Sequence, residues 1–315
     1  MKSLFIKSFK EKKYLYFFYR LFLFFFIVFV LDFVTGSLLR HYYFAQKAGS
    51  QYRTNYSIDK ANADIMIFGS SRAVYHYIPT IFEESLNMSC YNAGSLDQHI
   101  LYHYAVFKSV LKRHIPRIVV LDVTSEEFKR NKQSYDKLSI LLPFYNTHPE
   151  VRTVIDLRSP YEKIKLMSKT YPFNSSLLMI AGGNTKYFAE RKQDIKGYIP
   201  LKKIWKDPIV NSPFPDYEVD NMKLSFFEKI LQDCIKNNIR LYLVHSPEYF
   251  IHENEDRSLK FVEKLAQKYC IKFMDFTNDP LFTNDPSLFN DPYHLNSKGA
   301  KMLSRRIAEN LVQIK

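Results

Sequence analysis

One continuous apolar run near the N-terminus most constrains what this chain can fold into. Residues 21–39 are apolar apart from Asp32 and a few small residues. At about 1.5 Å per residue, a helix of this length crosses a hydrocarbon core of about 30 Å. A cleaved signal peptide usually has a shorter apolar core and a small-x-small site, and no clean site follows this run. The sequence therefore predicts an uncleaved transmembrane anchor over 21–39, with a cleaved signal peptide as the alternative.

The charges beside this run predict its orientation. Residues 1–20 contain one acidic residue, Glu11, and six basic residues: Lys2, Lys7, Lys10, Lys12, Lys13 and Arg20. Basic residues flanking a membrane span tend to stay on the cytoplasmic side. We therefore expect a cytoplasmic flank over 1–20 and a single-pass membrane protein whose large C-terminal domain is extracytoplasmic.

The net charge does not indicate nucleic acid binding. Five of the 13 net positive charges belong to residues 1–20, and the others are spread along the chain. The sequence contains no dense basic run and no zinc-finger or helix-turn-helix pattern. A basic surface near anionic lipid or an acidic glycan is the better interpretation.

The cysteines form no recognisable set. Cys90, Cys234 and Cys270 are odd in number and lack a CxxC spacing, which argues against a metal site or a disulfide framework. Cys234 continues the apolar face of residues 224–231, which predicts a buried small hydrophobe. One disulfide among the three remains open.

Short apolar runs alternate with amphipathic segments over residues 63–315. Residues 40–62 lack a clear period and are interpreted as a stalk. Strands are predicted over 64–68, 89–92, 117–122, 240–245 and 271–275. Helices are predicted over 97–113, with Asp97 as the cap, and over 222–237, 258–269 and 297–312. This alternation predicts an α/β fold, a three-layer α/β/α sandwich with a mainly parallel sheet.

The alternation lapses between residues 129 and 220. This stretch is rich in Pro, Tyr, Asn and Ser, and a structureless loop of that length would be unusual. It is interpreted as a partly helical insertion on one side of the sheet, suited to a lid or a substrate surface. The tripeptide Asn-Asp-Pro recurs at 278, 284 and 290, which indicates turns.

Two motifs could carry chemistry at the carboxyl edge of the sheet, where such folds bind ligands. Gly69-Ser70-Ser71 follows the first strand, so a hydroxyl would lie near a helix N-terminus that favours anions. Taken alone, such a serine pair is more often a helix cap. His294 lies three residues after Asp291, just before the final helix. An imidazole oriented by a carboxylate can accept the proton of a serine hydroxyl, although Asp-x-x-His alone is a weak signal.

Together these motifs resemble the blocks of the SGNH/GDSL hydrolase superfamily. Residues 68–71 resemble its first block, 91–94 its second, and 291–299 its last. The resemblance implies a flavodoxin-like α/β fold, with Ser71, Asp291 and His294 as catalytic residues. It also implies an oxyanion hole from the backbone N–H groups of Ser71 and Gly94, and no metal or organic cofactor.

The third block departs from the family pattern. The family usually places Gly-x-Asn-Asp after a core strand, whereas this chain has residues 122–125, Asp-Val-Thr-Ser. Thr124 could replace the missing Asn donor only in part. Losing one oxyanion donor typically costs about 100- to 1000-fold in rate. We therefore expect that the chain hydrolyses esters slowly, transfers the acyl group to an acceptor other than water, or is inactive.

Other polar residues allow a structural and a functional interpretation. Arg72 and Asn92, beside the first two blocks, and His245, at the end of a core strand, are candidate substrate-binding residues; solvation or internal contacts are the alternative. His99 and His103 have a metal-ligand spacing without a third ligand, so no metal is expected. Asp32 marks either a contact with a membrane partner or the membrane interface.

The sequence thus predicts a serine esterase or O-acyltransferase acting on acyl esters of a cell-surface glycan or envelope polymer. A multispanning membrane acyltransferase is the partner that this function would suggest. The alternative is a catalytically inactive SGNH-like domain that binds a glycan or scaffolds a complex for surface-polymer assembly.

Overall fold

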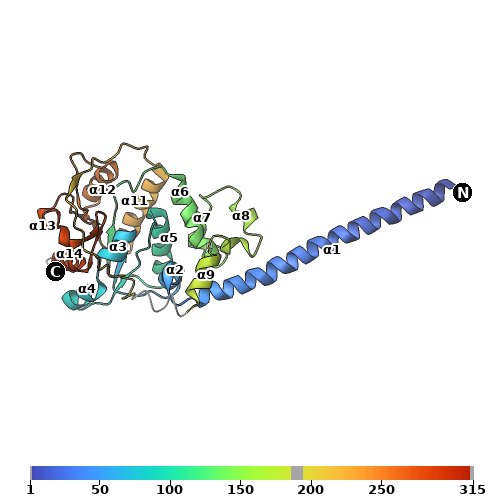
Figure 1. Cartoon of the computed structure of the whole chain (residues 1–315), viewed down its shortest axis with the longest axis horizontal. Helices are drawn as coiled ribbons and strands as arrows, with labels where there is room; N and C mark the ends of the chain where they lie inside the picture. The colour runs from blue at the N-terminus through green and yellow to red at the C-terminus, as the bar shows by residue number, and fades with distance from the viewer. Residues whose placement is uncertain (1, 186–193, 313–315) are drawn as a thin grey trace.

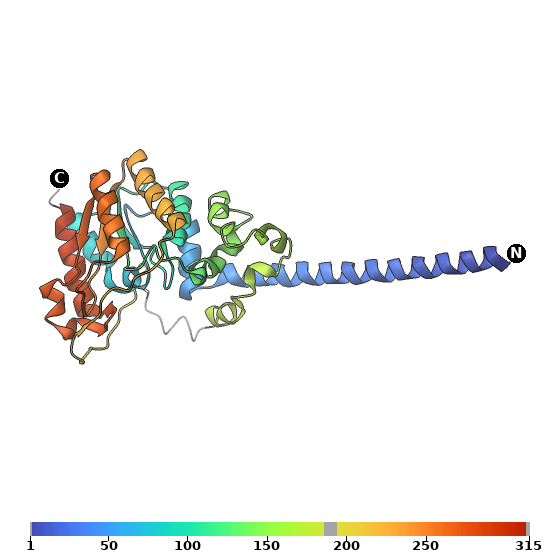
Figure 2. The same ribbon diagram turned by 90° about the horizontal axis from the view of Figure 1, so that it is seen from above.

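Five short strands form one fully parallel sheet in the order β2-β1-β3-β5-β7 in this computed structural model, which describes residues 2–185 and 194–312. The strands are β1 (Ile65–Phe68), β2 (Cys90–Asn92), β3 (Ile118–Asp122), β5 (Arg240–His245) and β7 (Lys272–Asp275). Each coincides with a strand predicted from an apolar run, and helices lie on both sides of the sheet (Figures 1 and 2). The predicted α/β fold with a parallel sheet is confirmed.

The two faces of the sheet are buried by two sets of helices. Met66, Val119 and Leu243 belong to the core that includes side chains of α5 (Ile100–Leu111), α11 (Asn221–Lys236) and α12 (Arg257–Lys268). Ile65, Val120 and Val244 belong to the opposite core with α3 (Ser71–His76), α4 (Pro79–Leu86) and α14 (Ser297–Val312). Neighbouring strand residues point to opposite faces, so a strand covered on both faces is apolar throughout.

Helix α5 begins three residues later than the apolar pattern suggested. Asp97 has a φ of 58°, outside the helix, and the N-cap residue His99 makes no side-chain cap. The first backbone N–H, that of Ile100, instead donates to Glu127 Oε1 at 2.7 Å. The cap therefore comes from a distant carboxylate, which a local pattern does not reveal.

Residues 40–62 do not form the expected stalk. Helix α1 (Lys2–Ala45) runs into this stretch, and α2 (Gly49–Asp59) packs against α5. Thr54 is fully buried, and its hydroxyl lies 2.8 Å from that of Tyr102. The segment therefore belongs to the folded body, and only the earlier part of α1 projects from it (Figure 1).

Helix α1 contains a stretch, Lys13–Ala45, that is long and apolar enough to cross a membrane. It includes the predicted anchor over 21–39. Large apolar side chains along it, among them Phe22, Phe29 and Leu31, are more than half exposed. These side chains have no protein core to cover them within the described residues.

The expected insertion is partly helical. Residues 186–193 of it lie outside the described residues. The others include α6 (Lys132–Asp136), η1 (Lys137–Phe144), α7 (Pro149–Ile155), α8 (Glu162–Lys165), η2 (Tyr171–Phe173), α9 (Leu177–Gly183) and β4 (Val210–Asn211). Strand β4 pairs with β6 (Phe250–Ile251), whereas η2 and α9 contact α1. The insertion therefore lies partly between the sheet and the projecting helix (Figure 2).

Candidate functional site

Ser71, His294 and Asp291 form one chain of hydrogen bonds. Ser71 opens α3 after β1, whereas Asp291 and His294 lie in the antiparallel pair β8 (Phe289–Asp291) and β9 (His294–Leu295). Ser71 Oγ lies 2.8 Å from His294 Nε2, and His294 Nδ1 lies 2.9 and 3.1 Å from the two Asp291 oxygens. With its Nδ1–H donated to the carboxylate, the imidazole can accept the hydroxyl proton at Nε2.

Backbone and side-chain donors hold the Asp291 carboxylate. The N–H groups of Tyr293 and His294 donate to Oδ1 at 3.0 and 3.1 Å, and Asn290 Nδ2 donates to Oδ2 at 3.0 Å. Burial raises the pKa of Asp291, but the hydrogen bonds and the nearby imidazole outweigh it and lower that pKa to about 2. The carboxylate is therefore ionised at neutral pH and fixes the imidazole.

The turn at Asp291 repeats a local geometry used twice nearby. Asp279 and Asp285, in the two earlier Asn-Asp-Pro copies, each accept the N–H two residues on, at 2.9 Å. They cap α13 (Pro280–Thr283) and η3 (Pro286–Leu288). The turn interpretation of the tripeptide is confirmed, and in the third copy the same turn also holds His294.

Two glycines let the strand ends approach the start of α3. Gly69 has a φ of 145°, and a Cβ there would lie 2.8 Å from Asp122 Cβ. A Cβ on Gly94 would lie 2.8 Å from that of Ala73. A larger residue at either position would push β2 or β3 away from Ser71, so both positions require glycine.

The expected oxyanion donors differ in how they are engaged. The Gly94 N–H donates to Asn92 Oδ1 at 3.0 Å. The Thr124 hydroxyl donates to the buried Glu127 carboxylate at 2.7 Å. Thr124 is therefore committed to another partner, contrary to the expected partial replacement of the missing Asn.

The Asn92 side chain makes internal hydrogen bonds that stabilise the fold. Its side chain is fully buried, and its Nδ2 donates to the carbonyl oxygens of Ala73 and Tyr77 at 2.6 and 3.0 Å. These bonds tie the end of β2 to α3, the helix that carries Ser71. This internal engagement argues against the expected contact with substrate.

Arg72 and His245 also face the interior, contrary to the expected contact with substrate. Arg72 is 3% exposed, forms an ion pair with Glu248, and donates to the carbonyls of Ser246 and Val123 at 3.1 Å. His245 Nδ1 lies 2.8 Å from the Val123 carbonyl oxygen, and burial lowers its pKa. Arg72 thus connects α3 to the loops after β3 and β5.

Replacing Arg72 with methionine is expected to lower the free energy of unfolding by about 3–5 kcal/mol, because it removes the cation that pairs with the carboxylates of Glu248 and Asp122. Urea denaturation of the full-length chain measures this change. The double variant Arg72→Met with Glu248→Gln should regain part of the loss. An unchanged unfolding free energy together with a raised KM would restore the substrate-binding interpretation.

Sequence reasoning missed His76. Its Nε2 accepts the N–H of Leu295 at 2.9 Å, its Nδ1 lies 3.0 Å from Ser246 Oγ, and its ring centroid is 6.2 Å from that of His294. Burial lowers the pKa of His76 well below its ordinary value, so the ring is neutral. His76 therefore holds the backbone beside His294. A histidine on the buried face of a short helix has no sequence signal that separates this role from ordinary packing.

His76→Leu is expected to lower kcat about 10- to 100-fold with KM unchanged, because His294 loses its backbone support. It should also cost about 1–3 kcal/mol of stability for the unpaired Leu295 N–H. Steady-state kinetics and urea denaturation measure the two effects. His76→Gln, whose amide oxygen can replace Nε2 as acceptor, should recover much of the rate; equal loss in both variants would contradict the positioning role.

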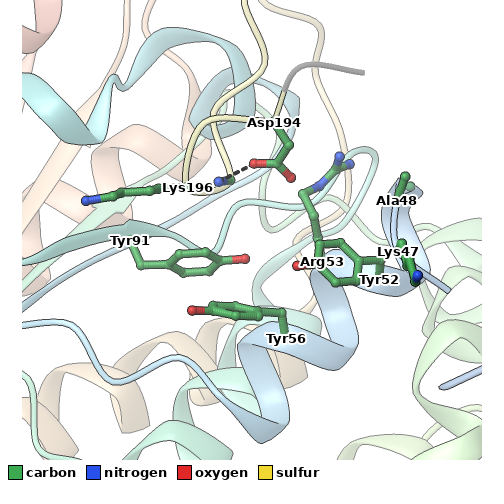
Figure 3. Close-up of a pocket in the computed structure, with 10 residues that line it drawn as sticks. Lys47, Ala48, Tyr52, Arg53, Tyr56, Tyr91, Asp194 and Lys196 are labelled. Carbon is green, nitrogen blue, oxygen red and sulfur yellow. Dashed lines mark hydrogen bonds between the residues drawn. The ribbon is translucent and has the colours of Figure 1, made fainter. Parts of the chain in front are cut away.

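A pocket of about 320 Å³ is lined by residues of α2, by Tyr91 of β2 and by the segment 194–197, and Ser71, Asp291 and His294 are not among its lining residues. The rings of Tyr56 and Tyr91 lie one above the other with centroids 4.8 Å apart (Figure 3). The other lining residues include three cations and one carboxylate: Lys47, Arg53, Lys196 and Asp194.

Tyr75 relates this pocket to His294. Its ring lies edge-on to that of His294, with centroids 5.2 Å apart. Burial raises the pKa of Tyr75, and the charges of Arg53 and Asp291 act on it with opposite signs. Both groups therefore lie within electrostatic range of one ring, with Arg53 in the pocket and Asp291 at the candidate site.

The remaining sequence candidates do not form a metal centre. Within residues 2–185 and 194–312, no group of three or more His, Cys, Asp or Glu side chains is placed to hold a metal ion. His103 is buried, and burial lowers its pKa to about 4. Cys90, Cys234 and Cys270 are free thiols, and Cys234 is buried as predicted.

Comparison with known proteins gives weak structural likenesses. No protein-family model and no curated protein matches the chain. A candidate acylhydrolase from Bacteroides fragilis matches with a TM-score of 0.40 and 11% identity, over 84% of this chain and 95% of that one. An acetyl xylan esterase matches with a TM-score of 0.39 and 17% identity, over 79% of this chain and 98% of that one.

Proposed function

We propose that this chain is a serine esterase or O-acyltransferase that acts on acyl esters of a cell-surface glycan or envelope polymer. The observation that carries the proposal is the hydrogen bond of 2.8 Å between Ser71 Oγ and His294 Nε2, with Asp291 on the far side of the imidazole. A hydroxyl is a poor nucleophile until a neutral imidazole accepts its proton, and a carboxylate holds the imidazole in the required tautomer.

The reaction proceeds in two balanced steps. Ser71 Oγ attacks the ester carbonyl while His294 takes its proton, and the alcohol leaves with that proton. Water or a sugar hydroxyl then attacks the acyl-serine and gives its proton to His294. As the bond to Ser71 Oγ breaks, His294 returns that proton to Oγ, and the free acid or the new ester leaves. The backbone N–H groups of Ser71 and Gly94 stabilise the oxyanion, which requires the Gly94 N–H to turn from the Asn92 side chain.

The neighbouring pocket supports a glycan substrate. Tyr52 and Tyr56 are partly exposed and line the pocket with an apolar ring and a polar tip each, which suits a ligand that is apolar on one face and hydroxylated at its edge. Arg53 is 3% exposed, and its Nε makes no hydrogen bond within the described residues. The positive charges of Lys47, Arg53 and Lys196 around the pocket would favour a polymer that carries carboxylate or phosphate groups.

We further propose that α1 anchors the chain with the N-terminus in the cytoplasm and the α/β domain outside. The basic residues before the apolar stretch support this orientation. An enzyme held there would meet polymers that are built at the outer membrane surface or pass along it. A multispanning membrane acyltransferase would be a suitable acyl donor system for the transferase reaction.

The alternative is a domain that binds the glycan without catalysis. The engagement of Thr124 with Glu127 favours it, because the third oxyanion donor of related enzymes has no counterpart here. Two measurements on the full-length chain separate the functions: release of acid from acetylated oligosaccharides, and binding of the same oligosaccharides by calorimetry. Turnover supports the enzyme, whereas binding without turnover supports the binding domain.

A further inference from the structure

The part of the insertion beside α1 exposes large apolar side chains. Ile164, Met167 and Leu178 are 66%, 78% and 88% exposed. Tyr161, Leu177 and Met179 are also exposed. Single exposed apolar residues are common, but several of this size within one short segment indicate a surface with an apolar partner.

Polar contacts fix this segment to α1. Asp32 Oδ1 accepts the hydroxyls of Ser168 and Thr170 at 2.7 and 2.6 Å, and Oδ2 accepts the N–H of Lys169 at 2.7 Å. A Cβ on Gly36 would lie 2.4 Å from the carbonyl carbon of Lys169, so the two backbones touch. The Asp32 carboxylate inside the apolar helix thus binds residues 168–170 of its own chain. These bonds fix the segment at one height along α1.

That height lies in the outer half of the proposed span. About 20 helical residues cross the hydrocarbon core, so a span that begins after Lys13 ends near Phe33. A span that begins at Leu21 would place Asp32 and Gly36 in its outer part. In the first case the segment that contacts Asp32 lies at the outer interface of the bilayer. In the second case Asp32 lies about 10 Å inside the outer end of the span, so the segment lies within the outer leaflet.

The composition of this surface fits phospholipid. Lys163 and Lys169 are exposed among the apolar residues, and their ammonium groups can pair with phosphates while their stems cover acyl chains; Lys165 is also exposed but pairs with Glu162 at 3.0 Å. A groove of about 260 Å³ between α1 and the insertion is lined by apolar side chains such as Phe33 and Phe173 and by Arg40. These residues would suit an acyl chain beneath an anionic headgroup.

We propose that residues 161–179, spanning α8, η2 and the start of α9, form a collar that embeds its apolar side chains in the outer leaflet of the membrane crossed by α1. The collar rests on the proposed anchor. It gives the α/β body a second attachment to the bilayer, so the body cannot turn freely about α1. Ser71 is then held at a constant height and faces one direction along the membrane surface.

Site-specific fluorescence of the full-length chain in nanodiscs of phosphatidylcholine and phosphatidylglycerol tests the collar. In a Cys270→Ser background, which removes the exposed thiol, an environment-sensitive dye is placed on Leu178→Cys. The control is Leu281→Cys in α13, which is 53% exposed and lies at the end of the body far from α1 (Figures 1 and 2). Lipids with a spin label high on the acyl chain should quench the dye at position 178 severalfold more than the dye at 281.

A third position separates failure of the collar from failure of the anchor. Phe26→Cys lies inside the proposed span in both cases, whether the span begins after Lys13 or at Leu21, and Phe26 is 52% exposed. Quenching at 26 without quenching at 178, or equal quenching at 178 and 281, would overturn the collar and leave the anchor. No quenching at 26 or 178 would overturn both.

Discussion

Replacing Ser71 with alanine is expected to abolish covalent labelling of the full-length chain by a fluorophosphonate and to lower ester turnover by roughly 10⁴- to 10⁶-fold. Fluorophosphonates react with serines whose hydroxyl is activated by a neighbouring base, and His294 Nε2 lies 2.8 Å from this hydroxyl. Gel fluorescence measures the labelling, and acid release from a small acyl ester measures turnover. The effect is large because no other group supplies the attacking oxygen.

The adjacent serine gives a matched control for this experiment. Ser70 precedes α3, and its hydroxyl makes no capping hydrogen bond to that helix. Ser70→Ala should keep both labelling and turnover close to those of the parent chain. Equal labelling of the parent chain and Ser71→Ala would show that the probe reacts elsewhere, and no labelling of the parent chain would favour the binding domain.

The strands could be predicted from sequence because a buried parallel strand reads as a continuous apolar run. Helix α2 could not, because its buried positions include Gln51, Arg53 and Thr54, which give no apolar period. Those side chains are covered only when α5 and the segment around Asp194 pack nearby. The local pattern of apolar residues therefore does not predict a helix whose polar side chains are buried by contacts with distant parts of the chain.

The candidate site likewise contains residues that a local motif reveals and residues whose role depends on distant contacts. Ser71 opens α3 directly after β1, and Asp291 and His294 flank the turn between β8 and β9; short motifs of turn and polar residues reveal such positions. Whether Arg72 meets substrate or Glu248 depends on the loop after β5, which is 176 residues away along the chain. His76 likewise acts through Leu295, whose N–H no sequence pattern brings to an imidazole.

Asp291→Asn is expected to lower turnover by about 10⁴-fold, the size of effect seen for this change in a serine protease triad. Hydrogen bonds from the His294 imidazole, Asn290 and the Tyr293 backbone, with the charge of the imidazole, outweigh burial and hold the pKa of Asp291 at about 2, so the parent carboxylate is ionised at neutral pH. With its N–H₂ group at the Oδ2 position, the asparagine would face Asn290 Nδ2, and its neutral oxygen would still accept from His294 Nδ1 but would no longer stabilise an imidazolium. With its N–H₂ group at the Oδ1 position, it would face His294 Nδ1 and the two backbone donors, which releases the imidazole from its tautomer. His294 would then carry its proton at Nε2, where it faces Ser71 as a donor and cannot accept the hydroxyl proton.

The dependence of turnover on pH, measured for the parent chain and for Asp291→Asn, tests this account of Asp291. Because its folded pKa lies below its ordinary value, the stability that Asp291 contributes is present above that ordinary value and is lost as pH falls through about 2. Any acid limb in the parent rate profile above that pH therefore reports another group. At high pH, where hydroxide can remove the serine proton directly, Asp291→Asn should regain part of its rate while Ser71→Ala does not. A variant with parent-like turnover near neutral pH would show that the carboxylate does not set the tautomer of His294.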